Sequence, residues 1–165
     1  TRLAMYVGPD PADADNWPDM PALTAFSSFH AVFKNNQDSI HMFRFLFPAN
    51  LAATPAAFIK LILQGTGTTG NARYEVSTKA INDAESGNPA AFTAETIINV
   101  VMSTTARTRK YQRFPATGSL TETVAADDIL EIKVKRLGTD GVNDTYEADV
   151  ELIGVVVGYD EKATP

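Results

Sequence analysis

The sequence predicts an all-β fold, a two-sheet antiparallel sandwich of jelly-roll type with about eight strands. Residues 127–160 contain two long runs of alternating apolar and polar residues, separated by a loop of turn-forming residues. Shorter runs of the same kind precede them, and most are followed by glycine, proline, asparagine or aspartate. No long segment has the periodicity of an amphipathic helix. A Greek-key barrel is the main alternative architecture.

Six predicted strands precede the final pair. They cover residues 24–33, 39–47, 58–64, 72–81, 96–103 and 110–116. In the second of them, Phe43, Phe45 and Phe47 lie on one face, and Pro48 ends the strand because proline lacks the N–H of a sheet ladder. The third strand alternates in the same way until the glycine- and threonine-rich residues 65–70 break it. Residues 90–94 are a candidate for a single helical turn.

The final pair is the most regular part of the chain, and we expect it to form a hairpin. The apolar positions are Leu130, Ile132 and Val134 in the first strand and Tyr146, Ala148, Val150 and Leu152 in the second. From Ile153 the apolar phase moves by one residue, with Gly154 at the change. A one-residue slip at a glycine predicts a β-bulge or a strand end covered on both faces.

The first 23 residues differ from the rest, so the predicted organisation is an extended arm over residues 1–23 and one sandwich domain over residues 24–165. Residues 8–21 hold four prolines and four aspartates, a composition that predicts extended backbone outside any regular sheet. We predict that the arm binds a partner surface. Its candidate binding residues are Pro9, Pro11, Trp17, Met20 and Leu23. Alternatively, Trp17 covers the core of its own domain.

Composition and charge exclude several classes of partner. The formal net charge is −6 and the pI about 4.8, which argues against nucleic acid, since its binding depends on clustered Lys and Arg. The basic residues 107–113 form a phosphate-contacting patch, a solvated strand or a contact to an acidic neighbouring chain, and the last two are favoured. No apolar run approaches the about 20 residues of a membrane span, so no membrane partner is expected. Cysteine is absent, which excludes disulfides and thiolate zinc sites.

No catalytic constellation is visible, and we predict no enzyme activity, no cofactor and no metal. His41 shares a strand face with Phe43, which favours a structural histidine, although an oxygen-ligated metal at His30 or His41 is one alternative. Asp127 and Asp128 are adjacent, so in a strand they face opposite ways, which is wrong for a paired acid and base. The loop at residues 140–144 has oxygens for Ca²⁺ but lacks EF-hand spacing.

One pattern of residues in the second half of the chain carries a family resemblance. A strand ends in Arg136-x-Gly138-x-Asp140, then Asp144-Thr145 precedes a final strand that ends in Tyr159. Upstream, residues 58–61, 73–76 and 114–118 fit the same arrangement. Over residues 39–160 the sequence resembles jelly-roll structural proteins of tailed-phage virions. Arg136 departs from an otherwise apolar face and has two candidate partners for holding the loop, Asp140 and Asp144.

The resemblance implies a capsid decoration (cement) protein, or a fibre module of head or tail. It implies a homo-oligomer, commonly a trimer, on the outer surface of the virion with the major capsid protein as partner. The first hypothesis is therefore a non-enzymatic protein that stabilises a phage head by bridging neighbouring capsid subunits. The alternative is a carbohydrate- or receptor-binding jelly roll of a fibre or tail. Its candidate sugar-stacking residues are Tyr74, Tyr111 and Tyr146, each otherwise explained as strand packing.

Overall fold

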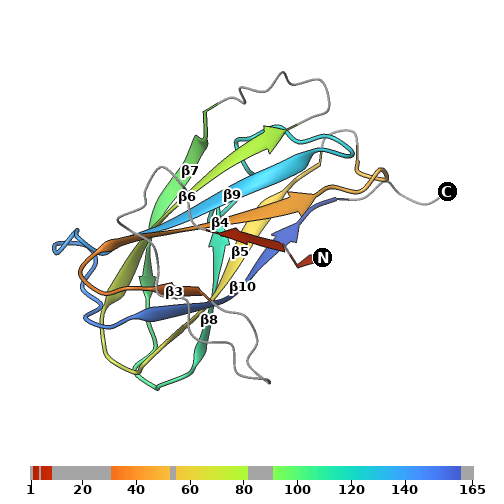
Figure 1. Ribbon diagram of the computed structural model, residues 1–165. Helices are drawn as coiled ribbons and strands as arrows, with labels where there is room; N and C mark the ends of the chain where they lie inside the picture. Colours follow the sequence, from red (N-terminus) through yellow and green to blue (C-terminus); the bar gives the residue numbers. More distant parts are fainter. Residues whose placement is uncertain (1, 4, 9–30, 53–54, 82–90, 161–165) are drawn as a thin grey trace.

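The computed structural model describes residues 2–3, 5–8, 31–52, 55–81 and 91–160, and within these ranges the chain forms ten β-strands and no helix (Figure 1). The strands are β1 (Arg2–Leu3), β2 (Met5–Gly8), β3 (Ala31–Phe33), β4 (Asp38–Leu46), β5 (Phe58–Gly65), β6 (Asn71–Ile81), β7 (Thr93–Val101), β8 (Arg109–Phe114), β9 (Ile129–Leu137) and β10 (Val150–Gly158). The predicted all-β class is confirmed. The predicted helical turn near residues 90–94 is wrong, since β7 begins there.

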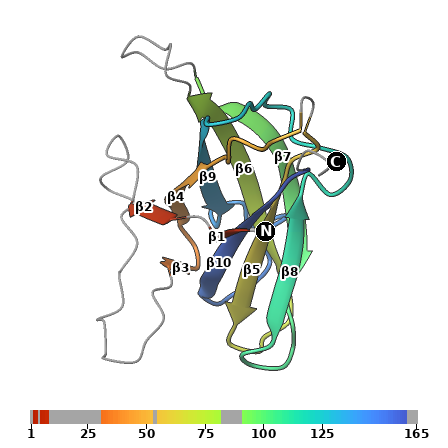
Figure 2. The same cartoon turned by 90° about the vertical axis from the view of Figure 1, so that its right-hand side faces the viewer.

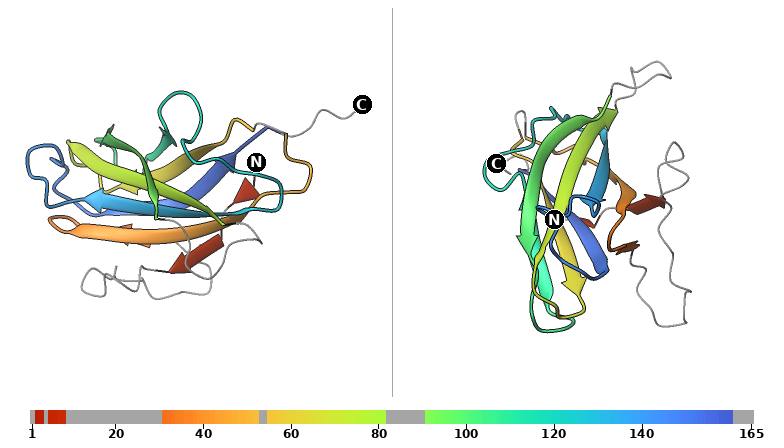
Figure 3. Two further views of the ribbon diagram at one scale, coloured as in Figure 1. Left: turned by 90° about the horizontal axis from the view of Figure 1, so that it is seen from above. Right: turned by 90° about the vertical axis from the view of Figure 1, so that its left-hand side faces the viewer.

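The strands form two antiparallel sheets that face each other, as the views of Figures 2 and 3 show. The first sheet has the order β1-β10-β5-β8, with β3 also paired to β10; the second has the order β2-β4-β9-β6-β7. From β3 onward successive strands change sheet at every step except β6 to β7, which pair with each other. This is the double Greek-key order of a jelly roll, so the predicted architecture is confirmed.

The core lies between the sheets and is built by the inward residue of each alternating pair. On β4 the inward positions include Phe43 and Phe45, and on β5 they are Ile59, Leu61 and Leu63. Residues at the ends of the sandwich complete the packing, since the ring of Phe47 lies edge-on to Phe45 with centroids 5.1 Å apart. Burial of these large side chains is the main favourable term that holds the two sheets together.

The final two strands do not form the expected hairpin. β9 pairs with β4 and β6 in the second sheet, whereas β10 pairs with β5, β3 and β1 in the first. β10 begins at Val150, so Tyr146 and Ala148 belong to the connection that crosses from one sheet to the other. The predicted irregularity at Gly154 is confirmed, because the register between β10 and β5 shifts between Leu152 and Gly154.

The first described residues of the predicted arm are strands at the sheet edges. Arg2–Leu3 pairs with β10 and Met5–Gly8 pairs with β4. The prolines that predict non-sheet backbone follow these strands, at positions 9–21, outside the described residues. The predicted boundary between arm and sandwich at residues 23 and 24 also lies outside them. The described part of the chain contains no helix with the length and hydrophobicity needed to cross a bilayer.

Candidate ligand-binding face

The outward side of β10, β5 and β8, which we call the open face, carries side chains set in regular rows. Because Ile59, Leu61 and Leu63 of β5 point into the core, Lys60, Ile62 and Gln64 point outward. Strand register then fixes their neighbours on both sides, and Figure 2 shows the three strands side by side. The rows are Glu151–Gln64–Arg109, Gly154–Ile62–Tyr111 and Val156–Lys60–Arg113.

The middle row forms an apolar floor. Tyr111 lies on the edge strand β8 with 61% of its surface exposed, directly opposite Ile62. Gly154 occupies the third position of the row, at the register shift that follows Leu152, so this position itself adds no side chain beside Ile62. An exposed aromatic ring next to an aliphatic side chain offers a flat surface on which the apolar face of a ligand can stack.

The first row supplies hydrogen-bonding groups next to this floor. Gln64 donates from Nε2 to Oε2 of Glu151 at 3.0 Å, so the two side chains hold each other in place. The amide oxygen of Gln64, the carboxylate of Glu151 and the guanidinium of Arg109 then present acceptors and donors along one line. Such a line can bind a ligand that carries several hydroxyl groups.

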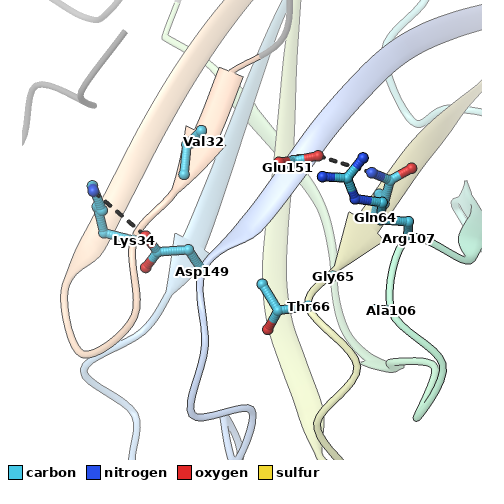
Figure 4. Close-up of a pocket in the computed structure, with 9 residues that line it drawn as sticks. All are labelled: Val32, Lys34, Gln64, Gly65, Thr66, Ala106, Arg107, Asp149 and Glu151. Carbon is cyan, nitrogen blue, oxygen red and sulfur yellow. Dashed lines mark hydrogen bonds and ion pairs between the residues drawn. The ribbon is translucent and has the colours of Figure 1, made fainter. Parts of the chain in front are cut away.

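The first row opens into a pocket of about 480 Å³ that extends from the end of β3 across the start of β10 to the end of β5 and the connection before β8 (Figure 4). It is lined by Val32, Lys34, Gln64, Gly65, Thr66, Ala106, Arg107, Asp149 and Glu151. Lys34 neutralises Asp149 across 3.4 Å, and the backbone N–H of Asn35 donates to the same carboxylate at 2.7 Å. The volume falls within the range of small-ligand pockets.

Backbone contacts fix the rim of this pocket. Arg107 has a φ of 60°, a conformation that side-chain-bearing residues rarely adopt, and its N–H donates to the carbonyl of Gly65 at 2.9 Å. The N–H of Thr66 donates to the hydroxyl of the buried Tyr146 at 2.9 Å. These bonds tie the ends of the pocket loops to the core, which limits how far the lining residues can move.

The outward side of the second sheet is different, because its charges are paired with each other. Glu131 accepts from Arg44 at 2.7 Å and from Lys79 at 2.8 Å, and Lys135 pairs with Asp38 at 2.8 Å. Burial alone would raise the pKa of Glu131, but the hydrogen bonds and charges of Lys79 and Arg44 outweigh it and hold this pKa below its usual range. This face has little unused charge to offer a ligand.

Of the three tyrosines predicted as sugar-stacking residues, only Tyr111 lies at the surface. Tyr74 is 0% and Tyr146 1% exposed, so both belong to the core, and packing, the other explanation given for them, applies rather than sugar stacking. Alternation placed Tyr74 on one strand face without showing that this face is the inner one. His41 is also buried, and its ring lies edge-on to Phe33 at 4.7 Å, in agreement with a structural role. His30 lies outside the described residues.

The predicted loop residues separate into two interactions. Arg136 binds Asp144 with two hydrogen bonds of 2.8 and 2.9 Å, whereas Asp140 pairs with Arg73 at 2.9 Å. Both carboxylates therefore face cations, an arrangement that does not suit Ca²⁺. Within the described ranges no three His, Asp or Glu side chains are grouped to hold a metal ion.

The predicted partner-binding residues lie outside the described part of the chain. These are Pro9, Pro11, Trp17, Met20 and Leu23. Conversely, sequence reasoning missed Ile62, Arg107 and Glu151 as members of a site. The alternation of β5 did place Gln64 opposite the core residues, but only the register shows that Glu151 and Arg109 lie beside it.

No protein-family model matches this chain, and no curated protein matches it. Similar solved structures include a family 16 carbohydrate-binding module-2, with 11% identity and a TM-score of 0.42 over 84% of this chain and 82% of the other. A CBM4 structure has 15% identity and a TM-score of 0.41, over 88% and 91%. TmCBM61 in complex with β-1,4-galactotriose has 9% identity and a TM-score of 0.40, over 96% and 83%. Similarity this low identifies neither a family nor a ligand, so a functional proposal has to rest on the open face itself.

Proposed function

We propose that this protein is a non-catalytic carbohydrate-binding module whose open face binds an oligosaccharide across β5 and β8. The exposed ring of Tyr111 carries the proposal, because it lies beside Ile62 and one row away from the polar line of Gln64, Glu151 and Arg109. A sugar ring has an apolar face and a rim of hydroxyl groups. It therefore needs a stacking surface and adjacent donors and acceptors, and the open face offers both.

The carboxylates of the pocket support binding rather than catalysis. Asp149 and Glu151 both line it, and a glycosidase needs two carboxyl groups, one of which must transfer a proton. Here Asp149 accepts from Lys34 and from the N–H of Asn35, and Glu151 accepts from Gln64. Carboxylates held by such hydrogen bonds and ion pairs serve to orient their polar neighbours rather than to transfer a proton. Release of reducing ends from a bound oligosaccharide would overturn the non-catalytic assignment.

Replacement of Tyr111 by alanine tests the binding site directly. Against a panel of plant, fungal and bacterial polysaccharides in affinity gel electrophoresis, we expect the wild type to be retarded by at least one polymer. Tyr111→Ala should weaken that interaction about tenfold or more because the stacking surface is lost, while Tyr111→Phe keeps most of it. Since Tyr111 is 61% exposed, the unfolding midpoint of the Tyr111→Ala variant should stay close to that of the wild type.

Ile97→Ala is the matched control, because Ile97 is 49% exposed on the second sheet and away from the open face. It should bind as the wild type does. If no polysaccharide retards the protein, or if Tyr111→Ala and Ile97→Ala behave alike, the open face is not a sugar-binding site.

Attachment to a phage capsid, with the major capsid protein as partner and the outer virion surface as location, remains a prediction. The arm residues that would carry it lie outside the described part of the chain. A glycan-binding face and a capsid-binding arm are compatible within one protein. The copy number in purified particles distinguishes the two virion hypotheses, because a shell protein is present in hundreds of copies and a fibre module in few.

A further inference from the structure

We infer that the ligand of the open face is an anionic oligosaccharide, one that carries carboxylate or sulfate groups; this inference rests on the proposed carbohydrate-binding function. The charge of the open face is opposite in sign to that of the whole chain. The chain as a whole has a formal net charge of −6. Apart from Lys34 and Asp149, which pair with each other at the far side of the pocket, four cations lie on or at the edge of the open face against the one carboxylate of Glu151. The cations are Lys60, Arg107, Arg109 and Arg113.

The opposing carboxylates near this face are already engaged. Glu151 accepts a hydrogen bond from Gln64 at 3.0 Å, and Asp149, at the far side of the pocket, pairs with Lys34 at 3.4 Å. The amide of Gln64 is uncharged and leaves the charge of Glu151 in place, so four cations face one carboxylate and the face keeps a net positive charge. A surface of one sign attracts ligands of the opposite sign and raises their rate of association.

Arg113 is the one cation of the four with a structural task. Its guanidinium lies 4.3 Å from the ring centroid of Phe58 and donates to the carbonyls of Pro115 and Gly118. By contrast, the side chains of Lys60, Arg107 and Arg109 make no hydrogen bond or ion pair within the described ranges, and both arginines are exposed. One unused guanidinium, that of Arg109, lies in the row that holds Gln64, and the other, that of Arg107, lies next to this row at the pocket rim.

The position of Arg107 indicates a defined site rather than a random surface charge. Its φ of 60° costs backbone energy, and the hydrogen bond from its N–H to Gly65 keeps it at the rim of the pocket. A planar guanidinium matches carboxylate and sulfate oxygens with two parallel hydrogen bonds. A neutral sugar over these arginines would remove water from their charges without supplying a counterion, which is unfavourable.

Affinity electrophoresis with polymers of different charge tests the inference. Polygalacturonate and alginate supply carboxylates, a sulfated glycosaminoglycan supplies sulfate, and xylan and a mixed-linkage β-glucan are neutral. We expect at least one acidic polymer to retard the protein. Whether the carboxylated or the sulfated polymers do so identifies the anionic group that the open face binds. The apparent affinity should fall several-fold when salt is raised from about 20 to about 300 mM, because counterions screen exposed charges.

The double variant R107Q/R109Q should reduce binding to the acidic polymer at least tenfold, since each arginine loses a charge-assisted pair. R44Q is the matched control, because it removes one cation from the second sheet, where Lys79 still pairs with Glu131. It should leave binding unchanged.

Other outcomes overturn the inference in distinguishable ways. Salt-insensitive binding to neutral polymers that depends on Tyr111 would refute the anionic ligand but leave the proposed function intact. Binding of single-stranded DNA as tight as that of the acidic polymer would show a general polyanion surface. Failure to bind any polymer would refute the proposed function and this inference together.

Discussion

Asp144→Ala should strongly destabilise the sandwich, because it leaves the guanidinium of Arg136 buried and without a counterion. The side chains of Arg136 and Asp144 are 0% and 2% exposed. Arg136 donates twice to Asp144 and also to the carbonyls of Tyr146 and Ala148 at 2.6 and 2.8 Å. A single side chain of β9 thus binds the connection that leads to β10, and so it links the two sheets to which β9 and β10 belong.

The expected loss follows from the geometry of this pair. Removing one partner of a buried ion pair costs about 3–5 kcal/mol, since the remaining charge has no water to replace the lost partner. Asp144 also accepts from the N–H of Arg73 at 3.0 Å, and that donor loses its acceptor in the variant. With an m-value of about 2 kcal/mol/M, the urea midpoint should fall by about 2 M.

Urea unfolding followed by circular dichroism measures the change. Asp140→Ala is the matched control, because the ion pair of Asp140 with Arg73 is partly exposed and its loss should cost far less. Arg136→Met combined with Asp144→Leu should recover part of the stability, since no charge stays buried, although the carbonyls of Tyr146 and Ala148 lose their donor. Equal midpoints for Asp144→Ala and Asp140→Ala would refute the reasoning.

Two further predictions concern the core. Burial lowers the pKa of His41 from 6.5 to about 4. Between these pH values the unfolded chain therefore binds a proton that the folded chain does not. The free energy of unfolding should fall on acidification through this range by up to about 3 kcal/mol. Urea midpoints at pH 7 and 4.5 check this, and His41→Asn should lose that part of the pH dependence. Gly65→Ala should lower the thermal midpoint, because its Cβ would overlap the hydroxyl of Tyr146, whereas Gly141→Ala, with nothing within 4 Å, should not.

The strands could be predicted because apolar alternation follows directly from the period of extended backbone. Phe43 and Phe45 mark β4, and Leu130, Ile132 and Val134 mark β9, at nearly the bounds that the structure has. The slip at Gly154 predicted the register shift for the same reason. Alternation says which residues share a face, but it does not say which strand lies beside which.

Strand pairing was therefore the part that the sequence could not supply. β9 and β10 are neighbours along the chain and have matching patterns, which suggested a hairpin. In a jelly roll such neighbours lie in opposite sheets, about 10 Å apart, and residues 138–149 cross that gap. Only Arg136 signalled the crossing, because a cation on an apolar face needs a buried partner from another element.

The open face was hidden for a related reason. β8 reads Arg-Lys-Tyr-Gln-Arg-Phe, and both of its faces are polar over the first five residues. Alternation groups Arg109 with Tyr111 but does not show whether they point inward or outward. The register with β5 decides it, because Gln112 lies opposite the buried Leu61 and Tyr111 lies opposite the outward Ile62.

The sign of the charge on the open face argues against a purely protective role. β8 is an edge strand of the first sheet, and charged residues on such strands prevent pairing with other molecules. Protection of this kind works with either sign, and the chain has 20 acidic against 14 basic residues to draw from. Nevertheless, Arg109, Arg113 and the neighbouring Lys60 are all basic, and they surround the exposed Tyr111. Edge protection accounts for basic side chains on such a strand but not for the exposed aromatic ring among them, whereas a binding face for an anionic sugar explains both together.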